Sequence, residues 1–181
     1  MSIIHFPWAA LAVAATVALP AGTPPPPARD ESEALAVIEK FRRKDPRLAR
    51  MFSQSAGYVV FPTVAKAGFG VGGAMGKGYV YQNGRLIGRS TLKQLTIGLQ
   101  AGGQAYSEVI FLEDEAALKN FKRGHLKLDA QASAVVLNER VSSDLPYRNG
   151  VAIVTMAEGG LMYEASVGGQ ELSFQPLTNG A

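Results

Sequence analysis

The fold is decided by residues 68–87, GFGVGGAMGKGYVYQNGRLI. The first eleven of these residues contain six glycines and little that could form a helix. Asn83-Gly84 then separates two short apolar runs, which is the strongest short-range signal for a β-hairpin. Glycines inside strands mark bulges, sharp bends or close backbone approach. The stretch therefore predicts an antiparallel hairpin within a strongly curved or barrel-like sheet.

Other short strands surround this hairpin. Alternating apolar residues over 95–101 predict a half-buried strand, and Pro62 is expected to end a strand at 58–61. Further strands are expected at 108–112, 126–132, 151–154, 161–167 and 171–174, with turns at 149–150, 158–160 and 168–169. Turns between neighbouring strands favour antiparallel pairing over a parallel sheet with crossover helices.

An amphipathic helix is expected at 31–44, before the first strand. Its apolar side chains fall within one arc of the helix, and its basic side chains lie opposite. The apolar set is Ala34, Leu35, Val37, Ile38 and Phe41. Acidic residues in the first turn and basic residues in the last turn complement the helix dipole.

Two shorter helices complete the expected set. Asp45-Pro46 predicts the cap and first turn of a helix that ends at Gly57. The other runs over 114–121 and stops at Gly124. The expected fold class is therefore α+β. It consists of an antiparallel, Gly-rich sheet, strongly curved or barrel-like, with N-terminal amphipathic helices and one further short helix.

The N-terminus has the character of a targeting segment. Residues 1–28 contain no Lys, Arg, Asp or Glu, and the apolar stretch Trp8–Leu19 suits the h-region of a signal peptide. An uncleaved anchor over Ile3–Ala21 and a chance apolar start are the alternatives. The expected domains are a signal peptide at 1–22, a Pro-rich linker at 23–29 and one folded domain at 30–176. The protein is accordingly expected to be exported, to the periplasm or to the surface of an envelope membrane.

Basic residues are concentrated in one part of the chain. Residues 40–93 hold 11 basic residues and one acid, Asp45, although the net charge of the whole chain is only +3. Helix dipoles and interleaved acids account for part of this charge. The remainder predicts a face for an anionic partner, because a Lys or Arg near an anionic bilayer contributes about 1 kcal/mol. Nucleic acid is not expected, since an exported protein rarely meets it and residues 40–50 hold no aromatic platform.

The chain offers little for catalysis. It has no Cys and only two His, His5 and His125, which excludes disulfides, Cys-ligated zinc and thiol nucleophiles. The pattern GFGVGG at 68–73 matches the dinucleotide motif in letters only, because no acidic residue follows it before position 108. We therefore expect no enzyme, no metal site and no cofactor. A small enzyme that uses Asp129, Glu108 or His125 is the weaker alternative.

Several ordered blocks of the sequence resemble the SYLF domain. They are AGYVVFP at 56–62, KAGFGVGG at 66–73, GKG at 76–78, LQAGGQ at 99–104, residues 118–130 and GLMYEASVG at 160–168. Together they cover about residues 33–175. Before Leu99 the family tends to be Gly-rich, whereas this chain has KQLTI at 93–97.

The resemblance implies a lipid-binding module. Eukaryotic members are associated with phosphoinositide binding and actin-linked membrane traffic, some yeast relatives bind actin, and bacterial members are typically exported. The eukaryotic activity uses an amphipathic N-terminal helix and basic residues. An anionic phospholipid such as phosphatidylglycerol or cardiolipin is therefore the expected ligand of an exported member. The expected lipid-binding residues are Lys40, Phe41, Arg42, Arg43, Lys44, Arg47, Arg50, Lys66 and Lys77.

Two further expectations concern the partner. Backbone N–H groups of the glycines at 68–78 are a possible cradle for a phosphate, by analogy with anion nests. The alternative to lipid binding is an envelope scaffold whose basic face binds an acidic protein partner.

Overall fold

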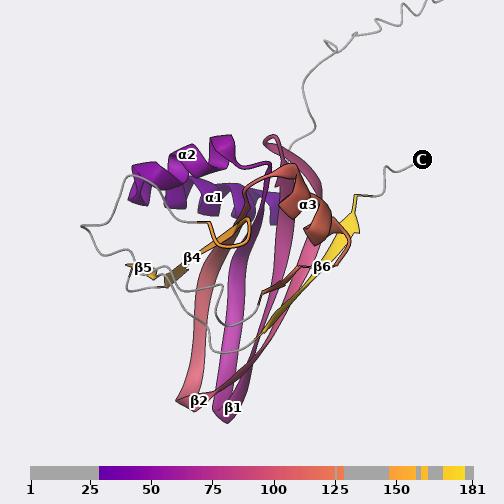
Figure 1. Cartoon of the computed structure of the whole chain (residues 1–181). Coiled ribbons are helices and arrows are strands. Elements are labelled where there is room, and N and C mark those ends of the chain that lie inside the picture. Colours follow the sequence, from indigo (N-terminus) through magenta and orange to yellow (C-terminus); the bar gives the residue numbers. More distant parts are fainter. Residues whose placement is uncertain (1–28, 125, 129–146, 158–159, 163–168, 178–181) are drawn as a thin grey trace, which may run out of the picture.

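A computed structural model describes residues 29–124, 126–128, 147–157, 160–162 and 169–177 (Figure 1). Its helices are α1 (Arg29–Lys44), α2 (Pro46–Gln54) and α3 (Glu115–Lys122). Its strands are β1 (Gly57–Gln82), β2 (Arg85–Leu112), β3 (Lys127–Leu128), β4 (Val151–Ala157), β5 (Gly160–Met162) and β6 (Gln170–Pro176). The expected α+β class with antiparallel strands is confirmed. The predicted signal peptide lies outside the described residues.

Most of the sheet is one long hairpin. β1 and β2 pair from Gln82 opposite Arg85 to Gly57 opposite Leu112. The turn is formed by Asn83-Gly84, as expected, with φ of 51° and 73°, a left-handed conformation that suits Asn and Gly.

Pro62 does not end the first strand, contrary to our expectation. The pairing of β1 with β2 shifts between Phe61 and Val64, and this irregularity accommodates the proline within β1. Among the described residues β1 pairs with β2 alone, so the N–H that proline lacks is not required by a second neighbour.

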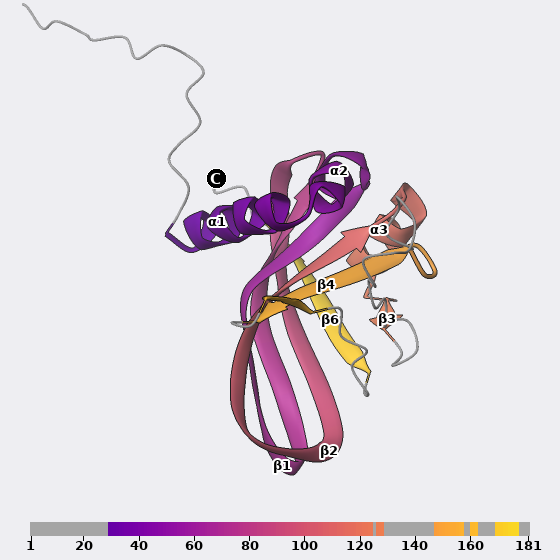
Figure 2. The same cartoon turned by 90° about the vertical axis from the view of Figure 1, so that its left-hand side faces the viewer.

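The hairpin folds back on itself at its midpoint, and the bent end lies away from the helices (Figure 2). The pairing slips between Phe69 and Val71, and a Cβ on Gly68 would collide with the backbone of Gly72. The two halves of β1 then lie against each other, because a Cβ on Gly78 would come within 2.6 Å of the Phe61 ring. We call the bent end, residues 66–75 of β1 and 93–104 of β2, the hairpin tip.

The remaining strands add to β2. The strand order is β3-β6-β2-β4-β5, with β1 paired to β2 off this path, and all pairs are antiparallel. β6 pairs with residues 88–94 of β2, and β4 pairs with residues 107–112. The sheet is not closed, so it is curved rather than a complete barrel.

Two hydrophobic clusters hold the helices on the sheet. In the first, α1 and α2 bury Phe41 and Phe52 beside strand residues such as Tyr58 and Phe111. The Phe52 ring centroid lies 5.0 Å from that of Tyr58 and 4.9 Å from that of Phe111, both edge-on. In the second, α3 buries Leu118 and Phe121 against the strands. The second helix ends at Gln54 with Ser55 as its C-cap, three residues before the Gly57 that we expected to end it.

The burial of β2 differs from the expectation near the hairpin tip. Leu95, which the alternating pattern at 95–101 predicted to face the core, is 61% exposed, while Gln94 is buried. Gln170 Nε2 of β6 donates to Gln94 Oε1 over 3.4 Å, so the polar side of β2 faces the interior here. The side chains of residues 96–102 lie outside the described set.

Candidate functional site

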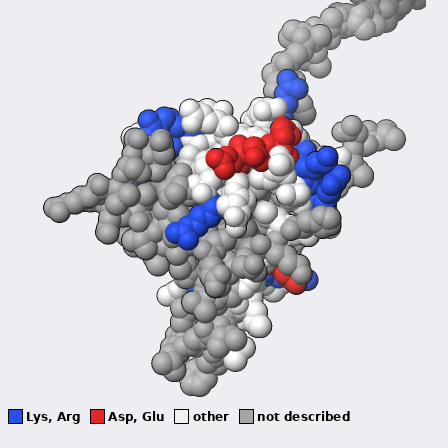
Figure 3. Space-filling model, viewed as in Figure 1, with Lys and Arg blue, Asp and Glu red and all other residues white. Residues whose placement is uncertain are grey.

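The basic residues of α1 and α2 are the first candidate site. Lys40, Arg42, Arg43, Lys44 and Arg50 are exposed, and Arg47 is partly buried. On the face shown in Figure 3, basic side chains form separate groups, and acidic side chains lie between two of them near the helices. The contacts of each cation therefore decide which of them can meet an anionic partner.

Arg47 is held by Asp45. Its Nη2 lies 2.6 Å from Asp45 Oδ2, and its Nε lies 3.1 Å and 3.0 Å from the two carboxylate oxygens. Asp45 also caps α2, because its side chain accepts the backbone N–H of Arg47 over 2.8 Å. The hydrogen bond from the Arg47 side chain lowers the pKa of the Asp45 carboxyl below its usual value. Arg47 thus stabilises the start of α2, and its guanidinium is engaged by Asp45 instead of being presented to a partner.

Arg42 has two neighbours. Its Nη1 lies 2.9 Å from Glu39 Oε1, and its guanidinium carbon lies 5.1 Å from the centre of the Phe52 ring. Both members of the ion pair are substantially exposed, and such surface pairs contribute little stability. Arg42 can therefore exchange Glu39 for another anion at small cost.

Phe41 is a core residue. Its side chain is 0% exposed and packs in the cluster beneath α1, together with Ala34 and Ile38. Phe41, which we expected to contact lipid, is therefore not exposed in this structure, because the apolar side of α1 is covered by β1 and α2.

Lys40, Arg43 and Lys44 remain exposed at the end of α1. Within the described part of the chain, no hydrogen bond or ion pair of these three side chains is found. Successive helix residues are 100° apart, so the three fall within about 100° on the side away from Ala34 and Ile38. They form one cationic surface, which we call the α1 basic face.

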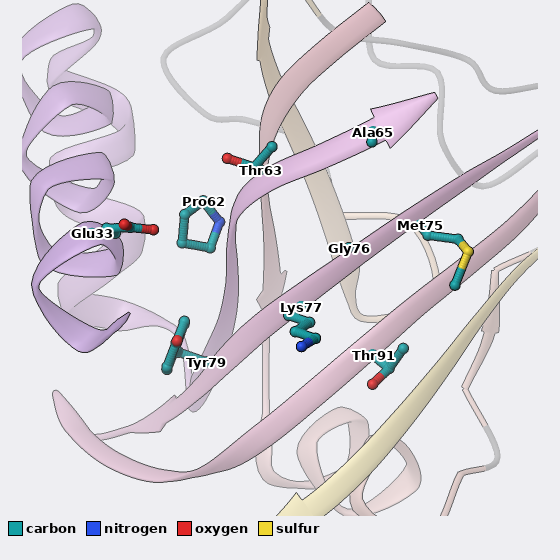
Figure 4. Close-up of a pocket in the computed structure, with 9 residues that line it drawn as sticks. All are labelled: Glu33, Pro62, Thr63, Ala65, Met75, Gly76, Lys77, Tyr79 and Thr91. Atoms are coloured by element: carbon teal, nitrogen blue, oxygen red, sulfur yellow. The ribbon is translucent and has the colours of Figure 1, made fainter. Parts of the chain in front are cut away.

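A groove of about 480 Å³ runs beside α1 along the two halves of β1 (Figure 4). Its lining includes Glu33 from α1, Thr63 from the first half of β1, and Met75 and Lys77 from the second half. Lys77 is exposed there, whereas Lys66 is partly buried and is not among the lining residues. The two lysines expected to share one surface therefore differ in their surroundings.

The glycines at 68–78 do not form the expected phosphate cradle among the described residues. They belong to β1, and all of them except Gly70, which lies at the slip between Phe69 and Val71, pair with residues of β2. The described glycines with left-handed φ are Gly84, Gly124 and Gly150, none of which lies in this segment. An anion nest needs alternating helical and left-handed residues, so an extended strand does not supply one.

The candidate catalytic residues are not brought together in the part of the chain that the structure describes. Glu108 is buried in β2, and Gln170 Nε2 donates to its Oε2 over 3.4 Å. Its carboxylate therefore belongs to a buried polar cluster that joins β2 and β6. His125 and Asp129 lie outside the described residues.

Among the described residues, no three His, Asp or Glu side chains gather in a way that could hold a metal ion. None of the described helices has the length and apolar character to cross a bilayer.

Residues 93–180 match the profile of the Ysc84 family, described as Las17-binding protein actin regulator. This part of the chain belongs to the SYLF family. The expected family is thereby confirmed. The profile match covers β2 from Lys93 onward and the elements that follow it, whereas the α1 basic face precedes it.

The chain is also similar to Beta cell expansion factor A of Aeromonas veronii. The two are 28% identical over 139 residues. The aligned region covers 75% of this chain and 52% of the relative. The chain thus spans about half the length of the curated relative it matches.

Sequence reasoning missed three exposed apolar residues at the hairpin tip. Val71 and Met75 of β1 and Leu95 of β2 are each more than half exposed. The sequence did contain a pattern that could have indicated them. Val71, Gly73 and Met75 occupy alternate positions of a strand, in a segment without acidic residues. Which side of that strand faces solvent is decided by the fold-back of the hairpin.

Proposed function

We propose that this SYLF-family protein binds anionic phospholipid at a membrane surface through the α1 basic face, without enzymatic activity. The observation that carries the proposal is the exposure of Lys40, Arg43 and Lys44 on one side of α1, with no ion partner among the described residues. Each such side chain near an anionic bilayer contributes about 1 kcal/mol. Three of them support reversible binding that weakens with salt.

The packing of α1 supports an electrostatic mode of binding. Ile38 and Phe41 are buried against the sheet, so α1 offers its basic side to a membrane and keeps most of its apolar side in the core. Leu35 is 39% exposed, and Val37 of the same helix is partly buried. Arg42 joins the surface when it exchanges Glu39 for a phosphate.

The setting that we propose is the bacterial envelope. The family description names Las17 binding and actin regulation, which are properties of other members. An exported protein meets phosphatidylglycerol or cardiolipin instead, and these lipids present the same anionic chemistry as a phosphoinositide headgroup.

Co-sedimentation with vesicles tests the proposal. The full chain and a form that starts at Arg29 are mixed with neutral or anionic vesicles at low and high salt. We expect binding to anionic vesicles at low salt. A Lys40→Gln, Arg43→Gln, Lys44→Gln variant should bind about a hundredfold more weakly. The three residues together contribute about 3 kcal/mol of binding free energy, which corresponds to a change of that size in Kd. The matched control removes three exposed basic residues elsewhere, as Arg85→Gln, Lys119→Gln, Arg123→Gln.

Equal loss of binding in both variants would show that net charge, not the α1 basic face, governs association. Absence of binding to any vesicle, together with capture of one stoichiometric acidic protein from the envelope, would favour the scaffold function instead.

A further inference from the structure

Large exposed apolar side chains gather at the hairpin tip. Of the five such residues in the described part of the chain, three lie there: Val71 and Met75 at 62% exposed, and Leu95 at 61%. The other two, Leu35 of α1 and Leu177 after β6, are less exposed, at 39% and 43%. Apolar side chains that cluster in this way usually mark a surface that meets a partner or a membrane.

The three side chains share one face of the hairpin. Residues two apart on a strand point to the same side, so Val71 and Met75 lie on one face of β1. Leu95 pairs with Gly73, which stands between them, and directly paired residues point to the same side. Gly73 has no side chain to cover Leu95. The result is a continuous apolar face, which we call the tip face.

Basic residues border the tip face on the side toward the helices. Lys93 pairs with Met75, and Lys77 follows Met75 on the same side of β1. Both lysines are exposed. The tip itself contains no Asp or Glu. Two acids from other elements lie beside it: Glu171 of β6 pairs with Lys93, and Glu33 of α1 lines the groove that Met75 and Lys77 also line. A lysine with its apolar stem beside a hydrophobic surface can place its ammonium group among phosphates.

We propose that the hairpin tip inserts the tip face into the surface of an anionic bilayer, with Lys77 and Lys93 at the level of the headgroups. The proposal shares with the proposed function the choice of anionic lipid as partner, but it does not depend on the α1 basic face. The insertion is shallow. Within the described residues β1 pairs with β2 alone, so its outward backbone N–H and C=O groups must stay in the hydrated interface.

Charge favours lipid over a second copy of the chain as the occupant of this face. Two tips packed together would bring Lys77 of both copies to one interface. Glu171 of β6 pairs with Lys93, but Lys77 pairs with Thr91, and the tip itself contains no acid to neutralise it. Anionic headgroups neutralise the same lysines and leave the apolar residues in contact with acyl chains.

A fluorescent probe at the tip reports insertion directly. The natural chain has no Cys, so a single cysteine is a unique labelling site for the polarity-sensitive dye NBD in the full chain. We label Met75→Cys at the tip, Leu35→Cys on α1 and Leu177→Cys as an exposed control. With phosphatidylglycerol vesicles, the dye at position 75 should brighten and should be quenched more by a nitroxide near the headgroup than by one near the bilayer centre. The dye at position 177 should not change.

A second variant measures the contribution of the apolar residues. Val71→Ser, Met75→Ser, Leu95→Ser should keep the melting temperature, because all three side chains are exposed, and should weaken binding at high salt at least tenfold. The Lys40→Gln, Arg43→Gln, Lys44→Gln variant should retain the signal at position 75 whenever it is vesicle-bound. This separates failure of the tip from failure of the α1 basic face.

Three outcomes would overturn the proposal. One is vesicle binding with no change in fluorescence at position 75. Another is unchanged affinity in the serine variant. The third is brightening at position 75 in the absence of lipid as protein concentration rises, with a dimer in sedimentation analysis, which would assign the tip face to a second copy.

Discussion

The Asp45 carboxylate links two roles at the junction of α1 and α2. It caps α2 by accepting the Arg47 backbone N–H, and it accepts from the Arg47 guanidinium, with Nε donating to both carboxylate oxygens and Nη2 to Oδ2. Asp45 is buried, which strengthens this pair relative to an ion pair in water. The residue therefore fixes the start of α2 directly after α1.

Asp45→Asn should reveal the contribution of this charge to stability. Asparagine is also a good N-cap, so the variant removes the ion pair and keeps a capping oxygen. Since the pKa of Asp45 in the folded state lies below its unfolded value of about 3.9, the carboxylate stabilises the fold above about pH 4. This stabilisation is lost as the pH falls through the folded-state pKa. We expect a loss of about 1–2 kcal/mol at pH 7 and 5, and a smaller loss at pH 3, from urea unfolding.

The Arg47→Gln background provides the control. There the Asp45→Asn change should cost less at pH 7, because its partner is already absent. A cost that is equal at pH 7 and pH 3 would contradict the role assigned to the pair.

At the scale of elements, the long hairpin bends because small residues allow its halves to approach. Ala74, Gly76 and Gly78 of the second half of β1 are buried on the side that meets the first half. The Phe61 ring lies against this side. It is so close to Gly78 that position 78 has no room for a Cβ. The groove beside α1 is the exposed continuation of the same contact.

Gly78→Ala should destabilise the protein by about 1–3 kcal/mol, because the added Cβ would stand 2.6 Å from the Phe61 ring. Gly103→Ala is the matched control. It is also a strand glycine, but its added Cβ would have Lys66 O at 3.8 Å as its nearest neighbour, an ordinary contact. Chemical denaturation measures both. Combining Gly78→Ala with Phe61→Leu should restore part of the stability lost through Gly78→Ala. Equal losses of stability from Gly78→Ala and Gly103→Ala would refute the contact between the two halves of β1.

At the scale of the whole molecule, the two proposed membrane contacts lie at opposite ends. The helices are at one end of the hairpin and its tip is at the other (Figures 1 and 2). The Asn83-Gly84 turn belongs to the helical end, where Lys122 Nζ of α3 donates to Gln82 Oε1 over 2.8 Å. We therefore expect that one flat bilayer does not meet both surfaces at once.

From this geometry we expect the protein to bridge vesicles. Energy transfer between two anionic vesicle populations, one with donor and one with acceptor lipid, should rise when the wild-type chain is added at low salt. Either triple variant, at the α1 basic face or at the tip face, should abolish the rise while leaving residual binding to single vesicles. Bridging that persists in both variants would mean that another surface joins the membranes.

Local features of the fold could be predicted because each depends on neighbours close in sequence. The cap at Asp45, the turn at Asn83-Gly84 and the end of α3 at Gly124 all follow from backbone preferences within a few residues. The apolar arc of the first helix is of the same kind, and its burial confirmed Ile38 and Phe41 as inward residues.

The surface chemistry depended on contacts between distant parts of the chain. The concentration of basic residues in one segment made Arg47 and Lys44 equal candidates for contact with lipid. Only the tertiary contacts show that Arg47 is bound to Asp45 at the start of a helix and that Lys44 is exposed. The alternation of apolar and polar residues around Leu95 was visible in the sequence. The outward direction of the Leu95 side chain follows from the pairing of β2 with β6, which gives Gln94 a buried hydrogen-bond partner. Sequence patterns establish which residues share a face. The free energy of packing distant segments decides which face is buried.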